Sequence, residues 1–437
     1  MDHAAPQPPQ TGTALASATV RRVKAFVFLT VFIDFLGLGI LIPVLPFLVK
    51  RFNEDAIAVG LLSAAFALSQ FVATPALGAL SDRVGRRTVL IISLIGSALG
   101  YLVFGLAGGL AVMMVGRIID GVTGANISTA QAALADVTPE ARRSRAFALI
   151  GVAMTLGFVL GPAVGGILGE KAGLGVPVFV ACALSLSAGV LAFFGLPETL
   201  PEERRAKQPL GLARLNPLAP LAFAPSSKSV WWVIAALVVA SVPFTALSTN
   251  FGVYLDRVYS IDASGAAMLF TWMGVVLALV QGGIVRNLSG RVSDHAMAAV
   301  GLALLGAGFV ACAAAPAAWA LYVGIALVAA GSGLSTPTLT SIISRSAGEG
   351  RLGAALGFTT GLLSLTRVAG PLMAGLAFDR VSPSSVYWGG AVGVAAGLAL
   401  LLAGGRSAKR AAERVTAPPA PASHSTPPAT AAELPTC

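Results

Sequence analysis

The sequence has little charge for its length. Asp, Glu, Lys and Arg make up 11% of its 437 residues, whereas 56% are hydrophobic, and the mean hydropathy is +0.83. Soluble globular domains carry roughly a quarter charged residues. A composition so far from that value excludes a water-soluble fold and indicates a chain that lies in a membrane.

Histidine and cysteine are equally scarce, with three of each. They are His3, His295, His424, Cys182, Cys312 and Cys437. The histidines lie near the chain ends or beside a basic loop, which excludes a histidine-based catalytic site, and the cysteines are too dispersed for a disulfide framework or a metal site. The phosphate-binding pattern G-x-x-x-x-G-K-[ST] is also missing from the sequence, which disfavours an ATP-driven pump. We therefore expect no catalytic residues, no metal and no cofactor.

The net charge of +10 does not indicate a nucleic-acid partner, because the basic residues alternate along the chain. Most of them fall in every second segment between long apolar runs. The intervening segments hold only Lys50, Arg51, Lys171, Arg257 and Arg380. Since Lys and Arg concentrate in cytoplasmic loops, the distribution predicts a multi-pass protein of the inner membrane, embedded in the lipid bilayer, with both termini in the cytoplasm.

Twelve apolar runs are each long enough to cross a bilayer, which takes about 20 helical residues. They lie at about 25–49, 57–80, 88–109, 110–134, 146–169, 174–197, 230–255, 263–287, 296–315, 318–343, 352–378 and 384–404. The sequence thus predicts a disordered tail at 1–20, six helices within 21–197, a charged linker at 198–229, six helices within 230–405 and a disordered tail at 406–437. No cleavable signal peptide is expected, since the first run is too long for one.

The connection between the second and third runs carries a dense group of polar residues. The notable ones are Gly78, Asp82, Arg83, Gly85, Arg86 and Arg87. They match every fixed position of G-x-L-[SA]-D-R-x-G-R-[RK], so the segment resembles the signature of the major facilitator superfamily of transporters. An ordinary basic loop would explain the arginines, but neither the aspartate nor the spacing of the glycines.

This resemblance implies an all-α membrane fold, in which two six-helix pseudo-repeats surround a central cavity. The sequence keeps a trace of such a duplication, because Leu160–Gly166 and Ala369–Gly375 share a Gly-Pro pattern at corresponding places in the two halves.

In the superfamily the turn acts as a latch on the cytoplasmic side. By resemblance, Asp82 would face the start of the eleventh helix near Leu352–Ala354, and Arg86 would pair with Asp136 at the end of the fourth. Both pairs would form in only one state of the transport cycle, and so would bias the equilibrium between states.

Asp34 lies ten residues beyond Lys24 in the first apolar run, roughly 15 Å along a helix. A carboxylate near the middle of a bilayer is costly unless it is paired, hydrated or protonated. The residues from Asp34 to Pro46 resemble the first helix of the tetracycline-resistance branch of drug:proton antiporters. Asp34 is therefore a candidate for proton coupling or substrate contact. The alternative is an acid held neutral between helices, with a structural role alone.

Arg117 and Asp120 are three residues apart in the fourth run, on one helix face and near enough to pair. With the glycines that follow and Asn126, they resemble the R-x-x-x-G-x-x-G element of the superfamily, in which the arginine is implicated in proton transfer. Either Asp120 only neutralises Arg117, or a proton on Asp34 or Asp120 switches what Arg117 binds. We assign Arg117, Asp120 and Asn126 to proton coupling and the cavity.

The fifth run contains the pattern G-x-x-x-G-P-x-x-G-G. Its members are Gly157, Gly161, Pro162, Gly165 and Gly166. Glycines four residues apart give a helix a flat stripe for close contact, and the proline bends the helix. The pattern matches the element that marks antiporters in the superfamily, which implies export.

In the second half, Gln281 and Arg367 are the candidates for the cavity, and Asn250 is a further polar residue within an apolar run. Gln281 lies in a segment that resembles the eighth helix of the same branch. Arg367 precedes Gly370 and Pro371. It either lines the cavity or donates to backbone carbonyls that Pro371 leaves free.

The resemblance extends from about Val31 to Gly404 and is greatest to the tetracycline-resistance-like group of drug:proton antiporters. It implies a secondary active transporter that exports small, partly hydrophobic compounds in exchange for protons; we expect it to act as a monomer. Tetracycline exporters carry acids in their third and ninth helices, whereas here Gly100 stands at about the matching place in the third and 296–315 contains none. Export of a metabolite, such as a sugar or an amino acid, stays open as an alternative. A membrane-bound enzyme or a receptor without transport activity is the remaining one.

Overall fold

The computed structural model of the protein describes residues 11–52, 55–124, 127–139, 142–206, 216–219, 228–346 and 352–416. The first half contains α1 (Thr11–Lys50), α2 (Ala56–Val84), α3 (Arg86–Gly105), α4 (Leu110–Thr123), α5 (Ile127–Asp136), α6 (Arg143–Ala172), α7 (Val176–Gly195) and the short η2 (Glu202–Arg204). The second half contains α9 (Lys228–Tyr259), α10 (Ala263–Leu279), η4 (Val280–Val285), α11 (Arg286–Leu288), α12 (Asp294–Ala313), α13 (Ala318–Ser346), α14 (Leu352–Arg380) and α15 (Ser385–Thr416).

Within the described residues these helices form twelve spans that are long and apolar enough to cross a membrane. α4 and α5 together make the fourth span, Leu110–Asp136, and α10, η4 and α11 make the eighth, Ala263–Leu288. Helices are expected here, because in hydrocarbon every backbone N–H and C=O must be bonded within its own segment. The predicted all-α fold with twelve transmembrane helices is confirmed.

The two outermost helices extend into the predicted tails. α1 begins at Thr11, inside the tail expected at 1–20, and α15 continues to Thr416, past the boundary expected at 405. The extension of α15 follows from its composition, since 406–416 is rich in Ala, Lys, Arg and Glu, which are strong helix formers. The outer parts of both tails, like Asn126, lie outside the described residues.

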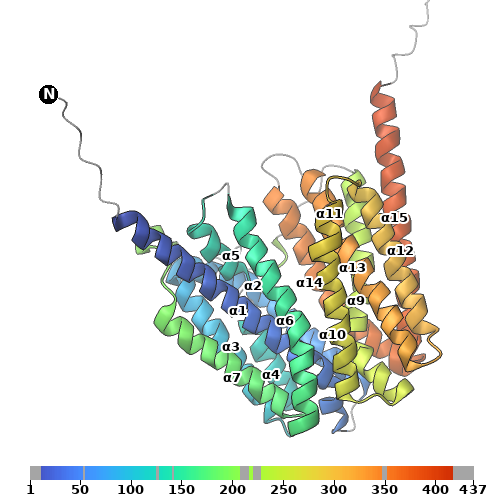
Figure 1. Cartoon of the computed structure of the whole chain (residues 1–437), viewed down its shortest axis with the longest axis horizontal. Helices are drawn as coiled ribbons and strands as arrows, with labels where there is room; N and C mark the ends of the chain where they lie inside the picture. The colour runs from blue at the N-terminus through green and yellow to red at the C-terminus, as the bar shows by residue number, and fades with distance from the viewer. Residues whose placement is uncertain are drawn as a thin grey trace, which may run out of the picture.

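The two bundles repeat one packing scheme (Figure 1). In the first bundle α1 packs on α6 and α7, and α3 packs on α4 and α7. In the second, α9 packs on α14 and α15, and α12 packs on α13 and α15. The bundles meet along two seams, α2 against α14 and α10 against α6. These seams correspond to each other when one bundle is matched to the other, so the predicted pair of six-helix pseudo-repeats is confirmed.

The glycine stripe of α6 lies against α1. No larger residue fits at Gly161, where an added Cβ would lie 2.6 Å from the Cα of Gly39. Gly157 and Gly165 are equally close to the α1 backbone, while Gly166 faces α10 of the second bundle. The stripe therefore holds α6 to α1, and its last glycine reaches across the seam between the bundles.

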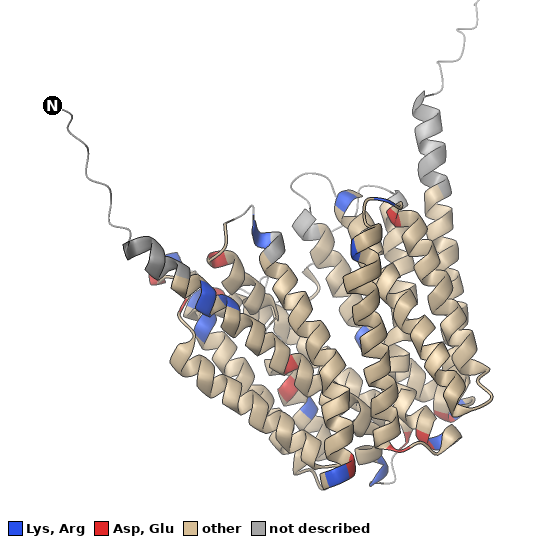
Figure 2. Cartoon of the chain, in the orientation of Figure 1, with Lys and Arg blue, Asp and Glu red and all other residues tan. Residues whose placement is uncertain are grey.

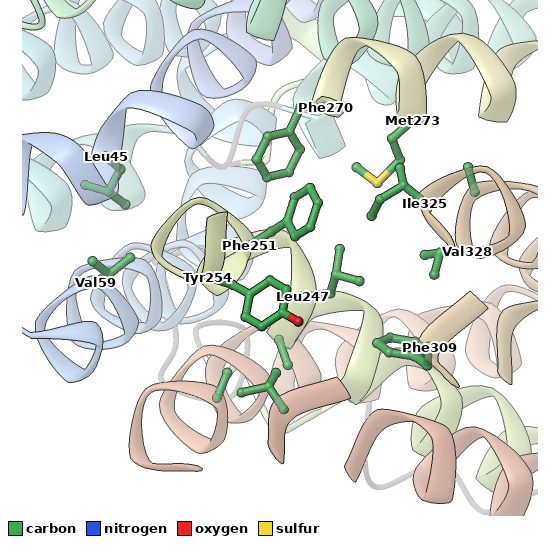
Figure 3. Close-up of a cluster of buried hydrophobic side chains, with 14 of the residues drawn as sticks. Leu45, Val59, Leu247, Phe251, Tyr254, Phe270, Met273, Phe309, Ile325 and Val328 are labelled. Atoms are coloured by element: carbon green, nitrogen blue, oxygen red, sulfur yellow. The ribbon is translucent and has the colours of Figure 1, made fainter. Parts of the chain in front are cut away.

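A buried apolar cluster joins the bundles towards the ends of α1 and α9. It includes Leu45 of α1, Val59 of α2, Phe251 of α9 and Phe270 of α10 (Figure 3). The rings of Phe251 and Phe270 pack edge to face, with their centroids 5.5 Å apart. Such a pair adds about 0.5–1.5 kcal/mol beyond the area that it buries. This cluster fixes one end of the seam between the bundles.

Candidate functional site

A cavity of about 210 Å³ lies between the two bundles. Its walls come from α1, α2, α4 and α6 of the first bundle and from α9 and α14 of the second. The residues that line it are Phe35, Leu38, Leu41, Ile42, Leu45, Ser63, Phe66, Ala67, Gln70, Arg117, Phe158, Phe244, Thr245, Ser248, Thr249, Arg367 and Pro371. Among these described residues, the two arginines are the only charged ones. An apolar wall with a few polar groups is typical of a small-molecule site.

Arg117 is held at the cavity wall by two helices. Its Nη1 donates to Oδ2 of Asp120 at 3.0 Å, and both side chains are 5% exposed. Its guanidinium lies 4.1 Å from the centre of the Phe66 ring of α2. Because removing one charge would leave the other buried and uncompensated, the pair acts as a unit. The pairing therefore has the geometry that the i, i+3 spacing predicted.

Tyr101 of α3 links this pair to Asp34. Its hydroxyl lies against Gly37 of α1, where an added Cβ would come within 2.8 Å of it, and both Asp34 and Asp120 act on it electrostatically. Asp34 is itself half-buried, and it lies on the face of α1 that also carries Leu38, Leu41 and Leu45 of the cavity wall. Sequence reasoning missed Tyr101, because a lone tyrosine in an apolar helix is typical of a core position.

Gly100, next to Tyr101, packs directly on Asp120. A Cβ at this position would lie 2.8 Å from the backbone nitrogen of Asp120, so any side chain would force α3 and α4 apart. Asp120 thus occupies the space in which an acidic side chain of the third helix would have to lie. This gives a physical reason for the departure from the tetracycline-exporter pattern at Gly100.

Arg367 reaches the cavity from α14, and its side chain is exposed there. It makes no hydrogen bond or ion pair to any other residue within the described ranges. Of the two roles predicted for Arg367, the structure therefore agrees with lining the cavity. It does not agree with hydrogen bonding to the backbone carbonyls near Pro371. The hydroxyls beside it on α9 are already bonded to helix carbonyls, Ser248 to the residue four earlier at 2.8 Å and Thr245 to Thr366 at 3.0 Å.

Gln281 was predicted to line the cavity and lies instead on an exposed face of η4. The wider turn of this π-helical segment shifts the register of the side chains within the eighth span. Asn250 of α9 is 1% exposed, and neither atom of its amide has a hydrogen-bond partner among the described residues. The third predicted amide, Asn126, lies in a part of the chain that the structure does not describe.

The turn between α2 and α3 is organised around Arg86. Gly85 has a φ of 105°, a conformation that residues with a side chain rarely adopt. The Arg86 side chain is buried and pairs with Asp82 at 2.5 Å and with Asp136 of α5 at 3.3 Å. It also donates to the Ser81 hydroxyl at 2.6 Å. Arg86 therefore ties α2 to α5, while Arg83 is exposed.

Glu198 of the linker holds the same turn. Its Oε1 accepts from the backbone N–H of Arg86 at 2.8 Å and its Oε2 from that of Arg87 at 3.3 Å. Such N–H groups at the start of a helix have no partner within the helix, and the helix dipole favours a negative charge there. Sequence reasoning missed this role because Glu198 is 112 residues from Arg86. The one feature of the sequence that could have indicated this role is the position of an acidic residue directly after the sixth apolar run.

Charged residues gather at the two ends of the helices, with few between them (Figure 2). At the end opposite the Arg86 turn, ion pairs join one bundle to the other. Lys50 pairs with Asp256 at 2.7 Å and Arg257 with Asp55 at 3.2 Å, while Arg257 also pairs at 3.2 Å with Asp379 of its own bundle. Asp379 also accepts a hydrogen bond from the backbone at the start of α2. Sequence spacing could not reveal these pairs, since Lys50 and Asp256 are 206 residues apart.

At the Arg86 end, the described ion pairs stay within one bundle or the linker. Arg86 forms its ion pairs with acids of the first bundle, and Arg345 pairs with Asp294 within the second bundle at 3.5 Å. The sequence predicted that Asp82 faces the start of α14. It also predicted that this contact and the Arg86–Asp136 pair form in the same state of the transport cycle. Instead Asp82 pairs with Arg86 in its own turn, while Arg86–Asp136 is already formed. The Arg86–Asp136 pair can therefore form while Asp82 is not in contact with the second bundle.

Comparison with known proteins agrees with this architecture. Residues 27–295 match the model of the Major Facilitator Superfamily. The chain belongs to this superfamily. Tetracycline resistance protein, class C, of Escherichia coli is 34% identical over 79% of this chain and 86% of its own length. Multidrug resistance protein 2 of Bacillus subtilis is 30% identical over 80% of this chain and 87% of its own. The structure of the human organic anion transporter MFSD10 is 27% identical, with a TM-score of 0.68 over 90% of this chain and 100% of that one.

As a member of the superfamily, the chain is a membrane transporter and not an enzyme. Its twelve apolar helices and its bacterial tetracycline-resistance relatives show a multi-pass protein of the inner membrane. The predicted resemblance to the tetracycline-resistance-like group is confirmed. The cavity between the bundles is thus the candidate site at which this transporter binds its substrate.

Proposed function

We propose that this transporter exports small amphipathic compounds in exchange for protons, by opening its cavity first to one side of the membrane and then to the other. The observation that carries the proposal is the cavity itself, which six helices of both bundles enclose and whose wall includes Arg117, the partner of the buried Asp120. A site between two bundles changes sides when the bundles rock against each other. The names of the relatives, for tetracycline resistance, multidrug resistance and organic anion transport, all fit amphipathic organic substrates.

We place the Arg86 end of the molecule in the cytoplasm, because the arginines of the turn and the basic linker lie there. In that orientation both termini are cytoplasmic, and the Lys50–Asp256 and Arg257–Asp55 pairs close the external end. The cavity then faces the cytoplasm in this conformation. Export would break these external pairs as the cytoplasmic ends of the bundles approach each other.

The Arg117–Asp120 pair offers a link between protons and substrate. A proton on Asp120 removes the charge that neutralises Arg117, and a proton on Asp34 alters the field at the Tyr101 hydroxyl that both acids share. Two ligands that change the same side chain are thermodynamically coupled. The proton gradient would supply the energy without a cofactor, and a monomer would suffice because one chain forms the whole cavity.

The test uses everted membrane vesicles that contain the transporter and are acidified by respiration, with acridine orange to report the internal pH. Exchange predicts that adding a transported compound from a panel of amphipathic drugs releases protons and restores the dye fluorescence. Asp34→Asn should abolish this release. Asp262→Asn is the matched control, since Asp262 is exposed and only caps α10.

Proton release that is absent with every compound of the panel, or that persists in Asp34→Asn, would contradict the proposal. Release with a sugar or an amino acid, but with no drug, would instead favour export of a metabolite by the same mechanism.

A further inference from the structure

The charges on the cavity wall do not cancel. Arg117 is neutralised by Asp120 at 3.0 Å, whereas Arg367 has no ion pair within the described residues although its side chain is exposed to the cavity. No carboxylate is found among the described residues that line the cavity. Asp34 of α1 is half-buried and is not among these lining residues. The wall therefore presents one positive charge without a counter-charge, in a space that is otherwise largely apolar.

Arg367 is also the main source of hydrogen-bond donors left to a ligand in the second bundle. The α9 hydroxyls that line the cavity use their protons within the protein: Ser248 and Thr249 donate to carbonyls of their own helix at 2.8 and 3.1 Å, and Thr245 donates to Thr366 at 3.0 Å. An arginine carries five N–H donors in a planar fork that fits a carboxylate or a sulfonate. Such a cation, in a largely apolar cavity, is stabilised by a ligand that brings the missing negative charge.

The rest of the wall fits the other part of such a ligand. Phe35, Phe66, Phe158 and Phe244 surround the cavity together with aliphatic side chains. Aromatic and aliphatic walls bind an apolar body through burial and ring packing. We infer that the substrates are small amphipathic anions, with an apolar ring system between the phenylalanines and the anionic group on Arg367. This inference rests on the proposed transport function and specifies its substrate class.

The charge of the substrate also fixes the electrical character of the exchange. If one monovalent anion leaves for each proton that enters, two positive charges move inward. If one monovalent cation leaves for each proton, no net charge moves. A membrane potential, negative inside, therefore accelerates anion export but not one-for-one cation export, which gives a readout that does not depend on the cavity variants.

The experiment compares two probes with the same ring and opposite permanent charge, 1-naphthalenesulfonate and 1-naphthyltrimethylammonium. Each is loaded into proteoliposomes that contain the purified full-length transporter, and its exit is followed under an inward proton gradient, with and without a potassium diffusion potential. We expect the sulfonate to leave faster than from protein-free liposomes, and faster still with a negative interior. The trimethylammonium compound should leave no faster than the background.

Arg367→Gln should raise the KM for the sulfonate about tenfold or more, because a charge-assisted hydrogen bond is lost, whereas Arg367→Lys should keep most of the activity. Arg286→Gln is the control, since Arg286 is exposed outside the cavity wall. Calorimetric binding of the sulfonate to the solubilised protein should show the same order of affinity without requiring transport, and size-exclusion chromatography should confirm that each variant is folded.

Proton-driven exit of the trimethylammonium compound alone would overturn the inference while leaving the proposed exchange intact. Sulfonate exit with an unchanged KM in Arg367→Gln would overturn the role of Arg367. If neither probe leaves, anion recognition is overturned, and the proton-release panel then decides separately whether the proposed exchange also fails.

Discussion

The two bundles use the same helix packing but carry their charges differently. In the first bundle, Arg117 is buried against Asp120, with Tyr101 and Asp34 close by. In the second, Arg367 enters the same cavity without a described partner. The duplicated fold thus supplies two similar walls, and a few charged residues give the walls separate tasks. We assign proton linkage to the first wall and recognition of the substrate charge to the second.

The largest effect is expected from breaking the charge pair of the first wall. Asp120→Asn leaves the buried Arg117 uncompensated, which should cost about 3–5 kcal/mol of stability and abolish transport. The double variant Arg117→Gln/Asp120→Asn should recover most of the lost stability, but not the transport. Thermal melting of the purified proteins measures the first effect and vesicle efflux the second. A stable, active Asp120→Asn protein would contradict the assignment of proton linkage to this wall.

Glycine contacts, in contrast to the charges, should behave alike in the two bundles. A Cβ at Gly161 would lie 2.6 Å from Gly39, and one at the corresponding Gly370 would lie 2.9 Å from the carbonyl of Val242. Gly161→Ala and Gly370→Ala should each lower the stability by about 1–3 kcal/mol, as overpacking does. Gly151→Ala, in the same helix as Gly161 but with nothing within 4 Å, is the control and should be neutral or stabilising. If only one of the two variants were clearly less stable, the two bundles would not share this glycine contact.

Asp55 tests the junction between the bundles. Asp55→Asn keeps a polar residue before the start of α2 but removes the ion pair with Arg257 of the second bundle. Because a surface pair contributes at most about 1 kcal/mol, we expect up to a fivefold shift of the conformational equilibrium towards opening at this end. Accessibility of a cysteine at Leu45, which is 5% exposed here, to a membrane-impermeant maleimide measures the shift. Glu202→Gln, which removes an exposed pair within the linker, should leave the accessibility unchanged.

An effect of similar size is expected where equivalent helices are capped differently. Glu198 of the linker, which is distant in sequence, caps α3. The corresponding α12 is capped by the side chain of Ser293, the residue directly before its first turn. Glu198→Ala and Ser293→Ala should each cost about 1 kcal/mol, seen as a small drop in melting temperature. Only Glu198→Ala should also speed proteolysis of the linker. Equal proteolysis in both variants would show that Glu198 does not tether the linker to the turn.

The elements of this fold were predictable where they depend on local sequence. Apolar length identified the twelve spans, and the spacing of Arg117 and Asp120 anticipated their pair, because both properties are fixed within a few residues. Tyr101 and Glu198 escaped prediction because their roles depend on partners from other helices. The pairs of Lys50 and Arg257 escaped for the same reason. Gln281 was misplaced because a π-helical turn has no clear signature in the sequence and changes which face a side chain occupies.

The most direct test of the account is whether the two ends of the molecule open in turn. With the native cysteines replaced, spin labels at Thr88 and Arg291 would report the distance across the Arg86 end, and labels at Arg51 and Ala314 the distance across the opposite end. Pulsed electron paramagnetic resonance at low and high pH, with and without 1-naphthalenesulfonate, should show one distance shortening as the other lengthens. Two distances that stay fixed under all these conditions, or that change in the same direction, would contradict alternating access to this cavity.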